Sequence, residues 1–161
     1  MSLPTSASVS VRIAASASDV YDLVADVTSM GRWSPECRSC EWLDEPGVEG
    51  SRFRGRNRSG PFRWTTEARV LTADRGREFS FATLHKGELA TRWTYQFEGG
   101  NPTTVTETFE AIRTPALIAF AERYVLRNRQ QQLEDGMRHT LAAVKEAAEA
   151  ASSASAGDSR A

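Results

Sequence analysis

The sequence predicts an α+β fold in which a seven-stranded antiparallel sheet is followed by one long C-terminal helix. Two observations carry this prediction: short runs of alternating apolar and polar residues separated by turn residues, and a helical pattern after the last run. The length of 161 residues suits a single domain. We therefore predict one domain over residues 9–150, a flexible N-terminus over 1–8 and a disordered Ala/Ser-rich tail over 151–161.

The chain begins with a predicted strand and two short helices. Residues 9–13 alternate between apolar and small or polar side chains, which is typical of a strand with one buried face. Ser16 or Ser18 can cap the next helix, whose apolar residues between 20 and 27 lie at helical spacing. The following stretch is broken by Gly and Pro, and it suits one tight turn that carries Trp33 as an aromatic plug.

Six further strands follow, over residues 37–43, 52–58, 62–72, 78–85, 89–98 and 104–112. Gly, Pro, Asn and Asp separate them at hairpin spacing, so we expect an antiparallel meander. Thr114 and Pro115 then open a helix that runs to about Ala150. At 1.5 Å per residue this helix would be about 52 Å long and should bend, break or overhang. The polar stretch 128–132 and Gly136 make that region the predicted hinge.

The alternation also assigns the two faces of the sheet. Four arginines between residues 52 and 58 share one face of their strand, and unpaired charges cannot face a core. The opposite face, which carries Phe53, must therefore point inward. Applied to all the strands of the meander, this rule places inward Phe53, Gly55, Asn57, Phe62, Trp64, Thr66, Ala68, Phe79, Phe81, Thr83, Thr91, Trp93, Tyr95, Phe97, Val105, Glu107 and Phe109. The rings of this set either fill a core or line a cavity, and the pattern leaves both open.

Glu107 is the one carboxylate on the predicted inward face, between Val105 and Phe109. If the hairpin at Gly99 places Phe97 opposite Val105, Tyr95 lies directly across from Glu107, within cross-strand reach. A phenol and a carboxylate can hydrogen-bond there as a satisfied buried pair. The same pair can orient a polar ligand group, or act as acid and base if desolvation raises the glutamate pKa.

Composition restricts the other kinds of site. The Cys37–Cys40 pair forms a CxxC motif, but two of the four ligands of a zinc site are missing nearby, so we predict no metal and no cofactor. No apolar run approaches the ~20 residues of a membrane span, and the first residues lack the features of a secretory signal. We expect a cytoplasmic protein and leave its oligomeric state open, a homodimer included.

Arginine residues gather in one part of the chain. Eight lie between Arg52 and Arg77, with only Glu67 and Asp74 opposing them in that span. A hairpin at residues 59–61 would set arginine opposite arginine in two of four outward pairs. Because the net charge is -1, we expect solvent rather than nucleic acid to screen this face. An RNA or acidic partner bound to the arginine face stays an alternative.

The order of elements resembles the START-like superfamily, the polyketide cyclase/dehydrase and lipid-transport group with its helix-grip fold. The resemblance covers Val9 to Ala150 and is carried by the helical segment 19–26, the Trp-Ser-Pro plug 33–35, the strand segment 104–110 and the closing helix. It implies that the sheet curves around the long helix, with a ligand between them. The ligand-binding residues we then expect are Trp33, Phe53, Asn57, Trp64, Thr66, Phe79, Phe81, Trp93, Tyr95, Glu107, Phe109, Phe120 and Tyr124.

The aromatase/cyclase members of this superfamily place an arginine inside the strand that matches residues 62–69. Aligning their second tryptophan with Trp64 puts that arginine at Ala68, and Arg69 faces the opposite side unless a bulge intervenes. We therefore predict a binding or carrier protein for a lipid-like or polyketide-like apolar molecule. An aromatase/cyclase or dehydratase that uses Glu107 and Tyr95, the candidate catalytic residues, is the alternative.

Overall fold

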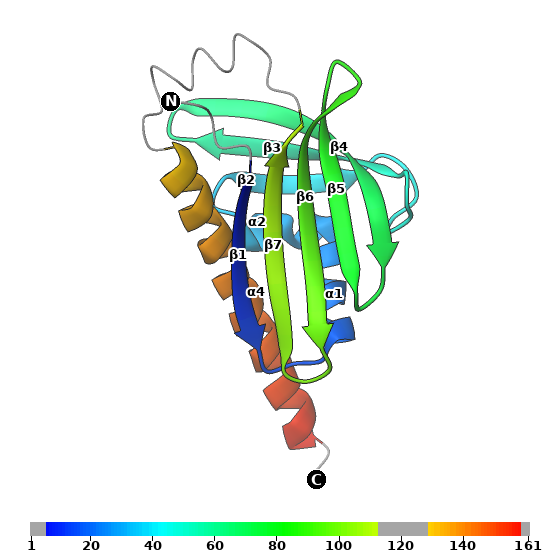
Figure 1. The fold of residues 1–161 in the computed structure, drawn as a ribbon, viewed down its shortest axis with the longest axis vertical. Coiled ribbons are helices and arrows are strands. Elements are labelled where there is room, and N and C mark those ends of the chain that lie inside the picture. The colour runs from blue at the N-terminus through cyan, green and yellow to red at the C-terminus, as the bar shows by residue number, and fades with distance from the viewer. Residues whose placement is uncertain (1–5, 113–128, 159–161) are drawn as a thin grey trace.

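The computed structural model describes residues 6–112 and 129–158 (Figure 1). In chain order the elements are β1 (Ser6–Ile13), α1 (Ala17–Ala25), the 3-10 turn η1 (Val27–Ser29), α2 (Met30–Trp33), β2 (Cys37–Trp42), β3 (Arg52–Ser59), β4 (Phe62–Asp74), β5 (Glu78–His85), β6 (Glu88–Gly99), β7 (Thr103–Ala111) and α4 (Arg129–Asp158). The predicted helix start at Pro115, and the site residues Phe120 and Tyr124, lie outside the described ranges.

The seven strands form one antiparallel sheet in the order β1-β7-β6-β5-β4-β3-β2. The curvature brings β2 and β3 crosswise behind the other strands in Figure 1. The predicted registers are confirmed, since Tyr95 pairs with Glu107, and Arg58 pairs with Arg63 across the β3–β4 hairpin. The sheet of the helix-grip fold is therefore the one the sequence predicts.

Two short helices close one end of the curved sheet. The Ser16 hydroxyl accepts a hydrogen bond from the Asp19 N–H, so Ser16 is the cap of α1. Val20 and Val24 of α1 are buried, and the Trp33 ring at the end of α2 is only 5% exposed. Trp33 is thus the aromatic plug that the sequence predicts.

The long helix α4 runs along the sheet next to β1 and extends past its lower edge (Figure 1). Its buried residues Met137, Leu141, Val144 and Ala148 are spaced four, three and four apart, which is one face of a helix. The Lys145 ammonium donates to the Arg12 carbonyl at 2.8 Å and fixes the helix beside β1.

Three boundaries differ from the sequence prediction. Helix α4 is continuous through Gly136, because neighbours such as Leu133, Glu134, Met137 and Arg138 favour helix enough to outweigh one glycine. Its alanine-rich end also favours helix, so α4 reaches Asp158 rather than ending near Ala150 and overhangs the sheet instead of breaking. Strand β1 starts at Ser6, within the stretch predicted to be flexible, because Ser6–Ser8 pair with residues 108–110 of β7.

Candidate functional site

A cavity of about 540 Å³ lies between the sheet, α2 and α4. Ten of the predicted ligand-binding residues line it: Trp33, Phe53, Asn57, Trp64, Thr66, Phe81, Trp93, Tyr95, Glu107 and Phe109. Trp64 is 40% exposed and lies where the cavity meets the surface. This volume matches the size of small-molecule sites in proteins.

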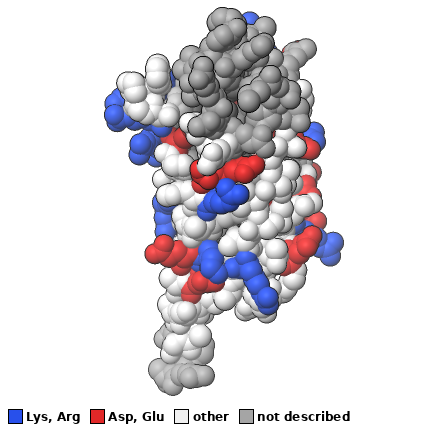
Figure 2. Space-filling view, turned by 60° about the vertical axis from the view of Figure 1, so that its left-hand side comes forward, with Lys and Arg blue, Asp and Glu red and all other residues white. Residues whose placement is uncertain are grey.

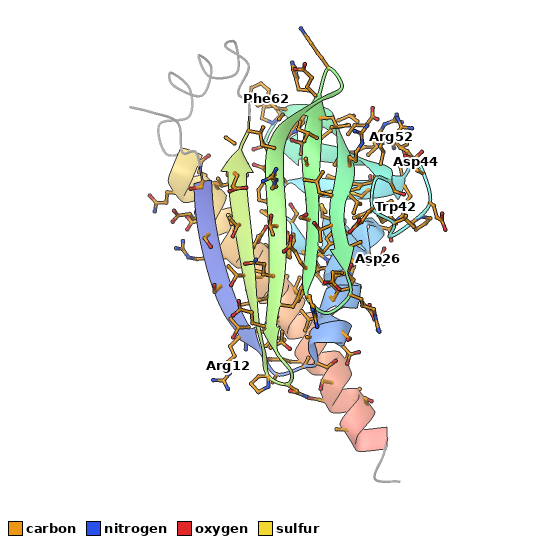
Figure 3. All side chains as sticks on the ribbon, turned by 45° about the vertical axis from the view of Figure 1, so that its right-hand side comes forward. Arg12, Asp26, Trp42, Asp44, Arg52 and Phe62 are labelled. Carbon is orange, nitrogen blue, oxygen red and sulfur yellow. The ribbon has the colours of Figure 1, made fainter. Side chains whose placement is uncertain are left out.

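Two predicted inward aromatics lie elsewhere. Phe79 is fully buried and does not line the cavity, because it packs against Tyr21 and Phe81 in the core. Phe62 is 71% exposed, so its inward placement is wrong. It lies beside the Gly60 turn at the end of the sheet, beyond the part that the described helices cover (Figure 3).

Small residues at inward positions leave the cavity open. Gly55, Ala68, Ala90 and Ala111 line it, so nothing large projects from these points. A Cβ atom at Gly55 would lie 3.4 Å from the Cys40 sulfur. Sequence reasoning stressed the aromatics of the wall, whereas the signal for a hollow was the small residues between them.

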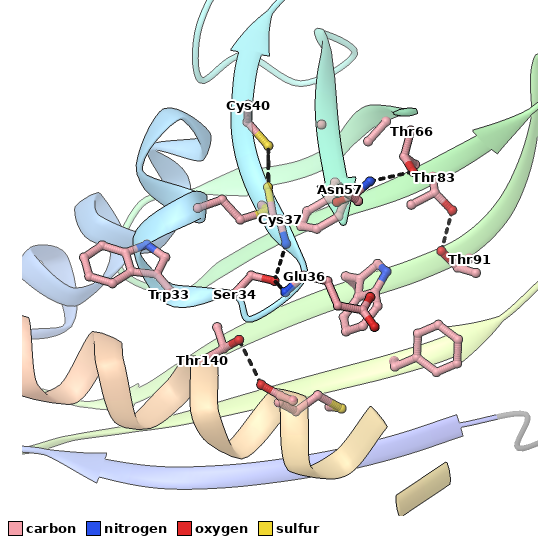
Figure 4. A pocket seen from close by; sticks show the side chains of 18 of the residues that line it. Trp33, Ser34, Glu36, Cys37, Cys40, Asn57, Thr66, Thr83, Thr91 and Thr140 are labelled. Carbon is pink, nitrogen blue, oxygen red and sulfur yellow. Dashed lines mark hydrogen bonds between the residues drawn. The ribbon is translucent and has the colours of Figure 1, made fainter. Parts of the chain in front are cut away.

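Most polar groups of the wall satisfy one another, as Figure 4 shows. The Asn57 amide donates to the Thr66 hydroxyl at 3.1 Å, and the hydroxyls of Thr83 and Thr91 hydrogen-bond to each other. The Thr140 hydroxyl donates to the Gly136 carbonyl of the preceding helical turn. These groups are already paired, so they do not by themselves require a polar ligand.

Glu107 is different, because one of its oxygen atoms has no hydrogen-bond partner among the described residues. The Tyr95 hydroxyl donates to Glu107 Oε1 at 2.8 Å, as predicted. The other oxygen, Oε2, is buried and makes no hydrogen bond within the described part of the chain. Trp33 Nε1 is the second buried polar atom of this kind, and both residues line the cavity. Buried polar atoms are normally paired, so these two indicate where a ligand can bind.

Burial controls the protonation of this pair. Desolvation raises the pKa of Glu107 to about 8, although the hydrogen bond from Tyr95 opposes this rise. The pKa of Tyr95 is raised well above its usual value by burial and by the neighbouring carboxyl group. At neutral pH Glu107 is therefore mostly a neutral carboxylic acid, which can donate a hydrogen bond into the cavity.

The arginine expected in an aromatase/cyclase is absent from the inward face of β4. Ala68 is 2% exposed and lines the cavity, whereas Arg69 is exposed and pairs in register with Arg52. A bulge occurs in β4 between Val70 and Thr72, after Arg69, so it does not turn this side chain inward. The departure seen in the sequence is confirmed.

The outward arginines follow the predicted register, but Arg54 forms its ion pair with a residue other than the glutamate that faces it. Glu67 stands opposite Arg54 in register, yet its carboxylate lies 3.6 Å from Arg52, and Arg54 pairs with Glu41 instead. Arg52 also forms a fork with Asp44, and Figure 3 shows the two side by side. Figure 2 shows a different side of the molecule, that of β1 and α4, where basic and acidic side chains are mixed. No described helix is long and apolar enough to cross a membrane.

The chain belongs to the polyketide cyclase / dehydrase and lipid transport family, whose model matches residues 4–149. A polyketide-cyclase-like protein from Corynebacterium glutamicum is 32% identical, with 92% of this chain and 88% of that chain covered and a TM-score of 0.54. No curated protein matches this chain.

Two more distant structures share the fold. The Zhui aromatase/cyclase from Streptomyces sp. R1128 is 18% identical over 89% of this chain and 93% of that one, with a TM-score of 0.71. A START superfamily protein from Mycobacterium smegmatis is 14% identical over 89% and 97%, with a TM-score of 0.66. The START-like helix-grip fold predicted from the sequence is thereby confirmed.

Proposed function

We propose that this chain binds an apolar, lipid-like or polyketide-like molecule in the cavity, with Glu107 donating a hydrogen bond to an oxygen atom of the ligand. The single observation that carries the proposal is the buried, unpartnered Oε2 of Glu107 at the wall of a 540 Å³ cavity. Family membership supports a small hydrophobic ligand. The cytoplasm stays the predicted compartment.

The protonation state of Glu107 determines which kind of ligand atom can hydrogen-bond to it. Oε1 accepts the Tyr95 hydrogen bond, so the acid proton of Glu107 belongs on Oε2. An O–H group at Oε2 needs an acceptor, such as a ketone, quinone or ester oxygen. The aromatic wall formed by Trp93, Phe81 and Phe109 suits a flat or chain-like apolar body around that oxygen.

Binding is a better proposal than turnover for this site. A neutral acid at Glu107 can polarise a ketone, which is the observation that favours an aromatase/cyclase or dehydratase as second candidate. However, β4 presents Ala68 where that chemistry places an inward arginine. Turnover of a poly-β-keto substrate mimic by wild-type protein and by Glu107→Gln tests this alternative, and equal rates would remove the carboxyl group from the mechanism.

A matched pair of ligands tests the binding proposal. We expect wild-type protein at pH 6 to bind 2-acetylnaphthalene roughly 2- to 10-fold more tightly than 2-ethylnaphthalene, which lacks the oxygen atom. At pH 9 Glu107 ionises, so the preference should disappear. Tryptophan fluorescence reports binding, since Trp93 lines the cavity. Near-UV circular dichroism at both pH values checks that the protein stays folded.

Two variants separate the cavity from the carboxyl group. Glu107→Gln keeps a donor and should keep the ketone preference at both pH values, whereas Glu107→Leu should lose it and still bind both ligands. Equal binding of both ligands by wild type at pH 6 would contradict the role of Glu107. A chain that binds neither, and shows no thermal shift with any lipid or polyketide tested, would contradict the binding function.

The arginine face supports one alternative of another class, an acidic partner such as RNA. Arg38, Arg56, Arg58 and Arg63 line a shallow groove at the ends of β2–β4 and form no ion pair in the described part of the chain. Binding by phosphate contacts would weaken log-linearly with salt, with a smaller slope after Arg56→Ala and Arg58→Ala. If these substitutions leave the RNA affinity at low salt unchanged, the arginines of the groove face only solvent and bind no acidic partner.

A further inference from the structure

The CxxC motif lies in the wall of the cavity, where the proposed function gives it no role. The Sγ atoms of Cys37 and Cys40 are 3.4 Å apart, and both residues line the cavity (Figure 4). The thiols are free, with Cys37 buried and Cys40 half-buried. Two thiols in contact at the surface of an apolar hollow are a potential binding site for a soft ligand.

The backbone of β2 brings the two thiols together. Residues three apart in a regular strand point to opposite faces of a sheet. A register shift between Cys37 and Ser39 adds one residue at this point, so Cys37 and Cys40 both face the cavity. Gly55 is the partner of Cys40 on β3, and its lack of a side chain leaves space beside the Cys40 sulfur.

A third sulfur atom completes the cluster. Met30 Sδ, at the start of α2, lies 3.9 Å from Cys40 Sγ, and Met30 lines the same cavity. A metal ion about 2.3 Å from each of two sulfur ligands holds them about 3.8–4.0 Å apart at tetrahedral to trigonal angles. The observed separations of 3.4 and 3.9 Å are therefore within about half an ångström of what a shared metal ion requires.

The donor set selects the kind of metal. No group of three or more His, Cys, Asp or Glu side chains is close enough to hold a metal ion among the described residues, so a four-ligand zinc site is not present there. Two thiolates and a thioether are soft ligands, and these favour Cu(I). A thioether cannot join a disulfide, so the position of Met30 fits a metal ion better than it fits a redox-active cysteine pair.

We infer that Met30, Cys37 and Cys40 form a binding site for a soft monovalent metal ion, Cu(I), in the wall of the ligand cavity. Both thiols lose their protons to solvent when the ion binds, because thiolate is the ligating form. The inference of a metal site does not depend on whether the cavity binds the proposed organic ligand.

Anaerobic titration of fully reduced protein with Cu(I), in competition with the chelator bathocuproine disulfonate, tests the inference. We expect one ion per chain, affinity that rises with pH, and an X-ray absorption spectrum with sulfur ligands at about 2.3 Å. Cys37→Ser and Cys40→Ser should each weaken binding by more than the roughly 10- to 100-fold typical of losing an outer-shell group. Met30→Leu should reduce the sulfur ligands from three to two.

Ser39→Ala is the matched control, because it changes one of the two residues between the cysteines without removing a sulfur atom, and it should bind Cu(I) like wild type. Thermal unfolding of each variant shows whether it has kept its fold. Wild-type affinity in both cysteine variants, or nitrogen and oxygen ligands in the spectrum, would overturn the site. So would Zn(II) binding as tight as Cu(I), or reduced protein that binds no Cu(I) and forms only a disulfide on exposure to air.

Discussion

The space between the sheet and the helices has a closed half, which side chains fill, and an open half, which contains the cavity. The two halves differ in the size of the side chains that project into them. In the closed half, Tyr21 meets Phe79 edge to face and Phe97 at a tilted angle. These rings fill the space in the same core cluster as Leu141 of α4. The open half belongs to the same sheet and the same helix, yet it leaves about 540 Å³ free. Strand pairing and curvature therefore do not decide where the cavity lies.

Side-chain volume at equivalent inward positions makes the difference. On β4, Ala68 borders the cavity, and two residues further along the strand Val70 is buried in the core cluster. On β5, Phe79 belongs to the closed half, whereas Thr83 lines the cavity. The comparison shows that a helix-grip sheet can be solid or hollow with the same alternating pattern. The following predictions test it, from the largest expected effect to the smallest.

Removing a ring from the closed half should cost the most stability. Phe79→Ala should lower the free energy of unfolding by about 3–5 kcal/mol, because it leaves a hole in a packed core. Urea denaturation measures this change. Phe109→Ala is the matched variant in the cavity wall, where the ring contacts Trp93 at a centroid distance of 4.9 Å but also borders free space. Equal losses for both variants would contradict the distinction between the two halves.

The buried acid of the open half should make stability depend on pH. The pKa of Glu107 is about 8 in the folded chain and 4.5 when exposed, so the folded state holds the extra proton between these values. The contribution of Glu107 to the free energy of unfolding should therefore be fully present below pH 4.5 and be lost as the pH rises to about 8, by on the order of a few kcal/mol. Glu107→Gln should flatten this slope. A profile that is the same in wild type and variant would contradict the raised pKa.

Adding volume should have opposite consequences in the two halves. Ala68→Leu extends into the cavity, so it should change stability little and weaken ligand binding. Ala148→Leu adds the same atoms to the closed half, where Ala148 is 3% exposed, and should cost about 1–3 kcal/mol through overpacking. Thermal unfolding and a ligand titration of both variants check this. If Ala68→Leu lowers stability more than Ala148→Leu does, the open half is tightly packed and the comparison is wrong.

The smallest effect concerns the outer face of the open half. Arg58 and Arg63 are directly opposed across the β3–β4 hairpin, and like charges in this position destabilise a sheet. Arg63→Glu should raise the free energy of unfolding by about 0.2–1 kcal/mol, and added salt should reduce the gain. Arg12→Glu is the control, since Arg12 lies opposite Thr104. An equal gain in the control would show that the opposed arginines are not the cause.

Sequence periodicity predicted the sheet well because pairing in a meander depends on local signals. The turn residues fix each hairpin, and this is why the Tyr95–Glu107 pair is predictable from the sequence. Phe62 was misplaced because alternation indicates the face of a strand but not where its covering helices end. The CxxC motif is visible in the sequence, but its two thiols could not be placed on one face, since the register shift between Cys37 and Ser39 has no strong sequence signal.

The position of β1 at the edge of the sheet, beside β7, also constrains the order in which the protein assembles (Figure 1). The hydroxyls of Ser8 and Thr108, which meet across these strands, are 100 positions apart in the chain. Hairpins from β2 to β7 need only short loops to close, whereas β1 must wait until β7 has left the ribosome. Because Val9 pairs with Glu107 in this step, the strand that carries the buried acid gains its second neighbour only after β2–β7 have been synthesised.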